Sequence, residues 1–377
     1  MGYERYEKAQ VNNGFEFTGK GGEFFSIWIV NVALTIVTLG VYSAWAKVRT
    51  LQYFYGNTLL DGTSFRFTAS PIQILKGRII AFVVFMLYFF GSQLSPLLAA
   101  AALIFIMLLL PAFLVMSMSF RLRHSVYRNV HFNFNKNFRR AYKVFSIPVL
   151  ITGTYILFLG LIQESLATTH NGPGYLLVIV IILMFTIALM LPWWEFMITQ
   201  FKAEHTKYGQ SDFTFSANTK AYYMMYLKMY GLMILVIAFG GGLISILFMT
   251  GLLDGTVTLM LPLIILVIVT AYLWVFAYMQ AKRTNIMYNN LDLEHIQVRS
   301  ELKTLDLLLL YVTNTMAIMF SLGLLMPWAK VRTARYRASK TSIETNGDLE
   351  QFVKAQVEKQ SALGEEMGEM FDMDLGL

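Results

Sequence analysis

The chain has 377 residues, of which 56% are hydrophobic and 14% are charged, and its formal net charge is +7. A soluble globular protein carries about 25% charged residues, so this composition excludes an ordinary soluble domain and indicates a membrane protein. Cysteine is absent, which excludes disulfide bonds, iron–sulfur clusters and thiol nucleophiles.

The first apolar element covers about residues 24–46 and runs into the basic hexapeptide WAKVRT, Trp45–Thr50. Its centre is polar, at Asn31 and Thr35, and a glycine lies two-thirds along it. No small-residue cleavage site follows the element, so we expect no cleavable signal peptide.

Three longer apolar blocks follow, and almost no charged residue interrupts them. Each block is long enough for two membrane crossings of about 20 residues. Turn-forming residues break the blocks in the middle, at Gly91–Pro96, Gln163–Gly174 and Thr250–Gly255. The pattern predicts three transmembrane helical hairpins, formed by segments 77–91 and 94–118, 143–163 and 174–198, and 223–249 and 257–280.

The last apolar element covers about residues 305–328 and ends in a second WAKVRT, Trp328–Thr333. Its centre is again polar, around Asn314. The apolar elements together predict a single repeat-built membrane domain over residues 1–352. The acidic segment 353–377 follows, and we expect it to be a mobile tail.

Lysine and arginine are distributed on one side of the hairpins only. The three breaks contain neither residue, whereas Arg121–Lys143 alone holds seven. By the positive-inside rule, the hairpins turn outside and their bases lie in the cytoplasm. We therefore predict a multi-pass plasma-membrane protein with cytoplasmic basic segments.

The basic segments share a repeated motif. It consists of a small residue or Phe, a Lys or Arg, two variable residues, then Thr, His or Asn, two more residues, and Tyr. Copies stand at Ala46–Tyr53, Phe120–Tyr127, Phe201–Tyr208, Ala281–Tyr288 and Ala329–Tyr336. We expect each copy to be a helical tail, with the Thr, His or Asn and the Tyr on one helical face.

Alternating phenylalanines accompany these motifs in an F-x-F pattern. They lie at Phe65–Phe67, Phe132–Phe134 and Phe213–Phe215, and Gly14–Gly21 near the start looks the same. The alternation predicts short strand-like segments on the cytoplasmic side. The predicted fold is therefore an all-α polytopic membrane protein with these short extended pieces.

The two terminal elements match each other without gaps, from Asn31 aligned with Asn314 through WAKVRT aligned with WAKVRT. If the element before the second WAKVRT spanned the membrane, that motif would face outside, against the charge rule. A re-entrant or broken element would keep it inside, provided that protein covers its irregular backbone or that it lines a cavity. We favour two such terminal elements flanking six spanning helices; the alternative is eight full spans with one WAKVRT outside.

Several stretches together resemble the YjgN family of bacterial inner-membrane proteins. They are FEFTGKGGEFF (Phe15–Phe25), LGVYSAWAKVR (Leu39–Arg49) and the repeated F-x-F segments, and the resemblance covers most of the chain. The family is a domain of unknown function, so the resemblance implies a polytopic bacterial inner-membrane protein and no catalytic residue. The second WAKVRT departs from the pattern, with Leu325–Pro327 in place of Tyr42–Ala44, which puts a shared role of Tyr42 in doubt.

Three polar residues inside the apolar elements are candidates for a membrane-embedded site: Asn31, Asn314 and Glu195. Intramembrane polar residues are functional candidates by default, particularly in broken helices. A neutral Asn also joins helices by hydrogen bonds, so a packing role stays open for the Asn pair.

A second group of candidates lies at the cytoplasmic ends of the apolar elements. Such a rim could contact anionic lipid headgroups at about 1 kcal/mol per basic residue, although topology signals and an aromatic belt explain the same residues without a site. His124 and His205 occupy equivalent positions but lack metal-site spacing, so we favour hydrogen-bonded structural roles. The rim residues are Trp45, Lys47, Arg49, Tyr53, Arg121, His124, Tyr127, Lys202, His205, Tyr208, Lys282, Tyr288, Trp328, Lys330, Arg332 and Tyr336.

These features favour a transport or channel-like function for a small solute, because repeats, broken elements and buried polar residues are typical of transporters. The alternative is a structural or lipid-interacting membrane protein with a basic-aromatic cytoplasmic rim. An intramembrane enzyme is least favoured, because the sequence has no nucleophile triad, zinc signature or nucleotide fingerprint. We expect anionic lipids as partners, and no enzyme activity, cofactor, metal or nucleic acid.

Overall fold

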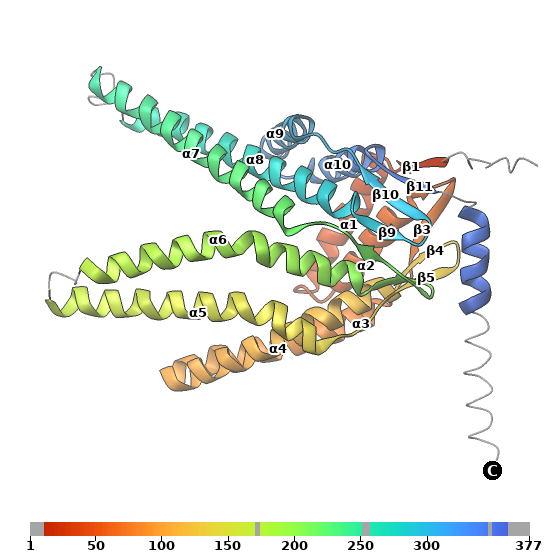
Figure 1. The fold of residues 1–377 in the computed structure, drawn as a ribbon, viewed down its shortest axis with the longest axis horizontal. Coiled ribbons are helices and arrows are strands. Elements are labelled where there is room, and N and C mark those ends of the chain that lie inside the picture. The colour runs from red at the N-terminus through yellow and green to blue at the C-terminus, as the bar shows by residue number, and fades with distance from the viewer. Residues whose placement is uncertain (1–10, 170–173, 251–256, 346–348, 361–377) are drawn as a thin grey trace, which may run out of the picture. The chain divides into compact units, whose positions relative to one another are not determined.

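The computed structural model describes residues 11–169, 174–250, 257–345 and 349–360 (Figure 1). The chain divides into two units. The first unit comprises Met1–Ser26, Asn57–Gly62 and Ser216–Asn346, and the second comprises Ile27–Gly56, Thr63–Phe215 and Gly347–Leu377.

The described part of the chain is mainly helical. The helices are α1 (Gly21–Val37), α2 (Ser43–Gly56), α3 (Pro71–Leu94), α4 (Pro96–Arg123), α5 (Phe138–Thr169), α6 (Gly174–Glu204), α7 (Thr219–Met249), α8 (Val257–Tyr288), α9 (Thr304–Phe320) and α10 (Met326–Ser339). The strands are β1 (Val11–Phe17), β2 (Thr58–Leu60), β3 (Thr63–Phe67), β4 (Ser125–Tyr127), β5 (Val130–Phe134), β6 (Thr206–Tyr208), β7 (Ser211–Asp212), β8 (Thr214–Phe215), β9 (Leu291–Leu293), β10 (Ile296–Ser300) and β11 (Thr341–Thr345).

Each unit contains a run of antiparallel strands. In the first unit the order is β2-β1-β11-β10-β9, so the pairing of β1 with β11 joins early and late parts of the chain. In the second unit the order is β3-β4-β5-β6-β7. The all-α expectation is therefore incomplete, because short strands link the helical hairpins throughout the chain.

The F-x-F prediction identified three of these strands. Phe15–Phe17 lies in β1, Phe65–Phe67 in β3 and Phe132–Phe134 in β5, whereas Phe213 lies outside β8. The other strands are short, and their pairing partners decide their conformation more than their own residues do.

The repeated motif is helical to its final tyrosine in only three of its copies. In the copies that begin at Phe120 and Phe201, the helix ends before the histidine position, and Tyr127 and Tyr208 lie on β4 and β6. The expectation of one helical face is therefore wrong for these two copies. The reason is tertiary: their last residues pair with β3 and β5 instead of continuing the helix.

Pairs of helices alternate with strands along the chain (Figure 1). Four of the helical pairs, α1–α2, α3–α4, α5–α6 and α9–α10, are each flanked by two strands that pair with one another. The chain therefore enters and leaves each of these hairpins through two neighbouring, paired strands. This connectivity keeps the basic motifs near the strands.

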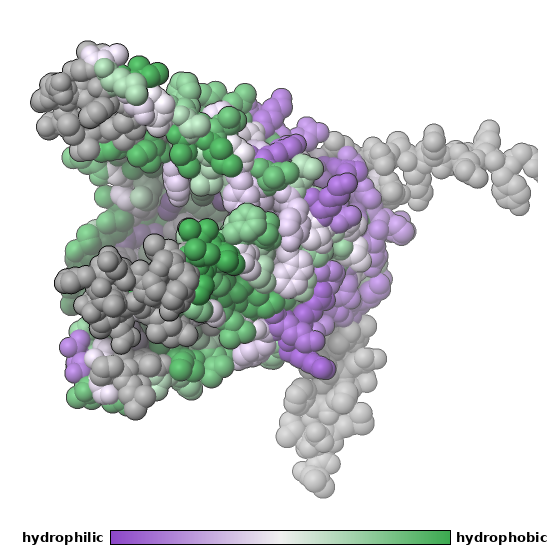
Figure 2. Space-filling view, turned by 60° about the vertical axis from the view of Figure 1, so that its left-hand side comes forward, coloured by the Kyte–Doolittle hydropathy of each residue, from purple (hydrophilic) through white to green (hydrophobic). Residues whose placement is uncertain are grey.

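Four helices in the described residues are long and apolar enough to cross a membrane: Pro71–Leu94, Ala101–Arg123, Val178–Glu204 and Thr219–Gly242. Helices α5 and α8 have 32 residues each, but parts of them fall outside the residues that could be assessed, so their predicted crossings stay predictions. The predicted breaks at Gln163–Gly174 and Thr250–Gly255 also lie partly outside the described residues. Figure 2 shows apolar side chains over the helices and hydrophilic side chains gathered beside the strands.

The two terminal elements are shorter. Helices α1 and α9 have 17 residues each, and each runs through a tight turn into a second helix of 14 residues. In both turns a leucine and the glycine after it have positive φ, 47° and 92° at Leu39 and Gly40 and 51° and 92° at Leu322 and Gly323. A φ near 92° suits glycine, which explains why each turn has Leu-Gly at this point.

The turns also share their hydrogen bonds. The Gly40 N–H donates to the Thr35 carbonyl at 2.8 Å, and the Gly323 N–H donates to the Ile318 carbonyl at 2.8 Å. The leucine at each tip is 94% exposed, so both hairpins end in an apolar tip. The sequence repeat is thus a repeat of backbone geometry.

The segment after β11 is more ordered than expected. Residues 349–360 form a helix in the second unit, in which Gln356 is 1% exposed. Its side chain accepts from the Gln210 N–H at 3.0 Å and donates to Ser211 Oγ at 2.7 Å. The expected mobile tail, 353–377, is therefore packed over its first residues, because Gln356 fills the β6–β7 turn; residues 361–377 lie outside the described residues.

Candidate functional site

The Thr, His or Asn of the repeated motif has a common structural role. In four copies it bonds to the carbonyl oxygen of the first motif residue, four positions earlier. These contacts measure 2.8 Å for Thr50, 2.8 Å for His124, 2.9 Å for His205 and 2.8 Å for Thr333. The two histidines thus each satisfy their own helix end.

The histidines gather no further ligand set. In the described residues, no group of three or more His, Cys, Asp or Glu side chains is placed to hold a metal ion. Burial is the main cause that lowers the pKa of His205, which favours the neutral ring. The absence of a metal at this pair stays a prediction.

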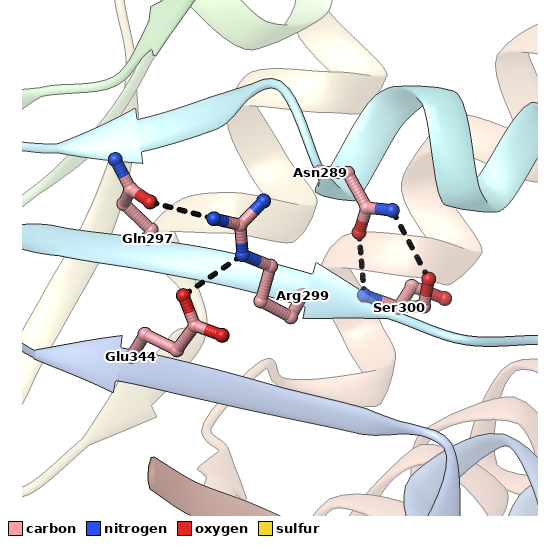
Figure 3. A network of polar contacts seen from close by, with 5 residues as sticks. All are labelled: Asn289, Gln297, Arg299, Ser300 and Glu344. Atoms are coloured by element: carbon pink, nitrogen blue, oxygen red, sulfur yellow. Dashed lines mark hydrogen bonds and ion pairs between the residues drawn. The ribbon is translucent and has the colours of Figure 1, made fainter. Parts of the chain in front are cut away.

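The fourth copy uses its Asn differently. Asn285 accepts from the Leu302 N–H at 3.0 Å and donates to the Leu302 carbonyl at 2.9 Å, beyond the end of β10. Asn289 binds Ser300 in the same way, and beside it Arg299 pairs with Glu344 at 2.9 Å (Figure 3). This network joins α8, β10 and β11 and has a structural role.

The motif tyrosines also contribute to packing. Tyr208 is buried and its hydroxyl donates to the Tyr127 carbonyl at 3.1 Å. Burial raises the pKa of Tyr208, so it stays protonated. In the C-terminal hairpin, the Tyr336 hydroxyl accepts from the Lys303 N–H at 3.1 Å and lies 3.2 Å from the Asp306 carboxylate.

Asn314, in α9, is the centre of a polar network in the C-terminal hairpin. Its Nδ2 donates to Thr333 Oγ1 at 3.2 Å and to the Ala329 carbonyl at 3.4 Å, and its Oδ1 accepts from Arg332 at 3.3 Å. The Arg332 guanidinium also donates to Thr313 and lies 5.2 Å from the centre of the Trp328 ring. Asn314 therefore holds α9 to α10, which is a packing role.

Asn31 is the counterpart of Asn314 in the N-terminal hairpin, yet its amide is not used in this way. The residue is 4% exposed, and neither side-chain atom has a hydrogen-bond partner among the described residues. Leaving such a group unpaired inside a protein costs about 1–3 kcal/mol. The burial of Asn31 without a partner therefore requires an explanation.

Two sequence differences account for the contrast. Tyr42 stands where the other hairpin has Leu325, and the Arg49 guanidinium lies 5.8 Å from the centre of the Tyr42 ring. Val30 stands where the other hairpin has Thr313, so the hydroxyl that accepts a hydrogen bond from Arg332 has no equivalent. Arg49 is thus drawn toward the half-buried Tyr42 ring and makes no hydrogen bond with the Asn31 amide.

A cluster of cations lies in the second unit, at the ends of three helices. Lys47 comes from α2, Arg78 from α3 and Arg121 from α4, and Arg78 donates a hydrogen bond to Ser43 Oγ. Partial desolvation of its side chain, and then the positive charges of Arg121 and Arg78, lower the pKa of Lys47. Among the described ion pairs, none includes these three side chains.

The aromatic neighbours of this cluster lie at the start of α2. The rings of Tyr42 and Trp45 stack with their centres 6.0 Å apart. The cluster thus combines uncompensated positive charge with amphipathic rings, as is typical of a membrane interface.

The remaining candidates are distributed over the two units. Asn31 and Glu195 belong to the second unit and Asn314 to the first. Glu195 is 8% exposed, within α6, and its carbonyl accepts from Thr199 at 2.9 Å. Several rim residues are exposed or half-buried at helix ends: Tyr53, Lys202, Lys282, Tyr288 and Lys330.

Sequence reasoning missed three residues that the geometry makes important. Arg78 and Ser43 complete the cation cluster, and Gln356 holds the helix after β11. The signal for Arg78 was present, because it is one of the basic residues before the first long hairpin. The signals for Ser43 and Gln356 depend on contacts distant in the sequence, which spacing does not reveal.

Comparisons with known proteins give a family. The family described as "Bacterial protein of unknown function (DUF898)" matches residues 12–370. The chain is similar to "Inner membrane protein YjgN" of Salmonella typhimurium, at 30% identity over 44% of this chain and 42% of that protein. It is also similar to "Inner membrane protein YjgN" of Escherichia coli K12, at 31% identity over 37% of this chain and 36% of that protein.

These matches span about two fifths of the length of the curated relatives. They confirm the resemblance to the YjgN family that the opening and the WAKVRT segments indicated. No solved structure matches the chain.

Proposed function

The chain belongs to the DUF898 family of bacterial proteins of unknown function, and on that premise we propose that it is a multi-pass inner-membrane protein that binds anionic phospholipids through a basic-aromatic rim. The curated relatives are named inner membrane proteins, and four helices in the described residues are long and apolar enough to cross a membrane. The rim is formed by the basic motifs at the strand-bearing ends of the helices.

One observation carries the proposal. Four helical hairpins return to the paired strands from which they left, so their motifs stay beside those strands. In such an arrangement the terminal hairpins are re-entrant, with apolar tips in the bilayer and both WAKVRT copies on the strand side. The distribution of Lys and Arg in the sequence supports a cytoplasmic location for this side.

Binding at such a rim has an energetic basis. A juxtamembrane Lys or Arg gains about 1 kcal/mol near an anionic leaflet. Exposed Lys47, Arg49 and Lys282 are available for this contact. The proposal assigns no reaction to the chain, so the expected absence of enzyme activity stays a prediction.

Native mass spectrometry of the detergent-extracted protein tests the proposal. We expect the protein to retain phosphatidylglycerol in preference to phosphatidylcholine when both are supplied, and to lose that preference as salt rises. Equal retention of the two lipids would contradict it.

A second function, the carriage of a small polar solute, is favoured by one specific observation. Asn31 is buried without a partner in a hairpin with a broken backbone, as in the binding regions of repeat-built transporters. The same spectra test this idea: it predicts a retained small solute that Asn31→Leu abolishes. Identical spectra for the two proteins would count against it.

A further inference from the structure

Three helices of the second unit each supply one cation, and the positive charges of Arg121 and Arg78 both act on Lys47. Lys47 lies on α2, Arg78 near the start of α3 and Arg121 near the end of α4. The hydrogen bond from Arg78 to Ser43 ties α3 to the start of α2. The cluster is thus built by the fold from residues that are far apart in the sequence.

The cluster lacks the carboxylates that the same unit supplies elsewhere. Arg140 pairs with Glu204 at 2.7 Å and Lys207 with Asp212 at 3.0 Å, so basic side chains with a structural role have acidic partners there. No described ion pair includes Lys47, Arg78 or Arg121. Three like charges without a counter-charge raise the free energy of the folded protein, and an anionic ligand would lower it.

The chemistry of the three side chains fits a phosphate group. A guanidinium offers a planar pair of donors to two oxygens, and an ammonium adds a point charge with rotatable donors. The stacked Tyr42 and Trp45 rings at the start of α2 are the residue types that lie at headgroup depth. Arg49 lies over Tyr42 and is exposed beside them.

We propose that Lys47, Arg78 and Arg121 form a binding site for one phosphate group, carried by a phospholipid headgroup or free in solution. This proposal rests on the proposed function, because the site is where the rim would bind a single headgroup. It is more specific, since it assigns the contact to three named side chains.

The second WAKVRT supplies a matched control. Lys330 occupies the position of Lys47, is exposed, and lies on a helix whose arginine, Arg332, is already bonded to Thr313 and Asn314. Lys330→Gln removes the same charge from the same motif without touching the cluster. A general effect of surface charge would make Lys47→Gln and Lys330→Gln weaken lipid binding equally. A specific site at the cluster predicts a larger loss for Lys47→Gln.

The experiment titrates the full chain in detergent with phosphatidylglycerol and counts bound lipid by native mass spectrometry. Lys47→Gln, Arg78→Gln and Arg121→Gln are each expected to weaken binding about tenfold, the effect of losing one charge-assisted hydrogen bond. Lys330→Gln is expected to stay within about twofold of the unmodified chain, because a single exposed charge outside the cluster contributes little in detergent, where no anionic leaflet is present. Melting temperature in phosphatidylcholine serves as the folding control.

A parallel arm replaces the lipid by inorganic phosphate and follows the melting temperature. Stabilisation by phosphate that the three cluster variants lose would identify a free anion as a ligand of the site. Phosphatidylglycerol binding that depends on the cluster, without any effect of phosphate, would identify the headgroup.

The site is overturned if the unmodified chain retains phosphatidylglycerol and the three cluster variants bind it as Lys330→Gln does. In that case rim binding stands and the cluster does not cause it. If the chain shows no preference for phosphatidylglycerol, the proposed function fails, and the phosphate arm alone decides: stabilisation that depends on the cluster supports the site, and its absence overturns it.

Discussion

The N-terminal and C-terminal hairpins have the same backbone geometry, but the buried asparagine has hydrogen-bond partners in only one of them. Both pass through a Leu-Gly turn with matching φ values and matching hydrogen bonds. In the C-terminal hairpin Asn314, Thr333 and Arg332 satisfy one another, whereas Asn31 in the N-terminal hairpin has no partner. The turn determines the backbone shape of the hairpin. A few other positions decide whether its buried asparagine has hydrogen-bond partners.

The two WAKVRT motifs make different contacts. Trp328 lies beneath Arg332, and a Cβ added at Gly21 would come within 3.2 Å of the Trp328 ring, so this WAKVRT is used for packing. The first WAKVRT instead places Lys47 in the cation cluster and Arg49 over Tyr42. The same hexapeptide thus has a packing role at one end of the chain and, in the proposed site, a binding role at the other.

Replacing the two asparagines should give the largest and clearest contrast. Asn314→Leu removes three hydrogen bonds and should lower the free energy of unfolding by about 1–3 kcal/mol, because Arg332 and Thr333 lose their partner. Asn31→Leu removes an unpartnered buried amide and should raise it by a similar amount, about 1–3 kcal/mol. Thermal unfolding in detergent measures both, and destabilisation of the same size by both variants would break the comparison.

The shared turn should respond equally in both hairpins. Gly40→Ala and Gly323→Ala place a side chain at a φ of 92°, which should cost about 1–2 kcal/mol in each case. No described atom lies within 4 Å of a Cβ at either position, so conformational strain and not a clash causes the loss. Gly22→Ala, also in open space but in a helix, is the control and should be neutral or stabilising. A large loss at one turn only would show that the two turns are not equivalent.

Converting the N-terminal hairpin into its counterpart should have a smaller effect. The double variant Tyr42→Leu with Val30→Thr restores the C-terminal pattern and should bring Arg49 to Asn31, with a gain of about 0.5–1 kcal/mol. A double-mutant cycle with Asn31→Leu measures the coupling. In the converted background Asn31→Leu should become destabilising; if it still stabilises, Arg49 does not reach the amide.

Removing charge from the cation cluster should have the smallest effect on stability. The pKa of Lys47 is lowered from 10.5, so the unfolded chain binds more protons in the window below 10.5, and stability rises with pH there. Lys47→Gln should therefore raise the melting temperature slightly at neutral pH, and the difference should shrink as pH rises through the depressed pKa. Lys330→Gln is the matched control, and an equal trend in both variants would argue against a cluster at Lys47.

Sequence patterns revealed the hairpins and the terminal repeat because both rest on local features. Apolar length and turn residues placed α3, α4, α6 and α7, and the ungapped match of Asn31 with Asn314 anticipated two hairpins with the same turn. The strands were largely missed, because three-residue strands such as β4 and β6 are defined by partners distant in the sequence. The same limit applies to Ser43, whose partner Arg78 is 35 residues away.

The contrast between the asparagines was equally inaccessible from the motif alone. Asn31 and Asn314 are the same residue type and occupy aligned positions, so the repeat predicts equivalent roles for them. Their difference depends on where one arginine side chain lies, which Tyr42 and Thr313 decide. Which group binds the arginine depends on the three-dimensional packing around it, which the motif does not contain.

The central claim is that both WAKVRT copies lie on the strand side of the membrane, and cysteine accessibility tests it most directly. The chain has no native cysteine, so single substitutions give clean signals. Gln52→Cys and Ser339→Cys mark the two motif helices, and Gln93→Cys, which is also exposed, marks the turn between α3 and α4. An impermeant thiol reagent on intact cells should label Gln93→Cys alone and reach the other two only after the membrane is opened. Labelling of Ser339→Cys on intact cells would contradict the account.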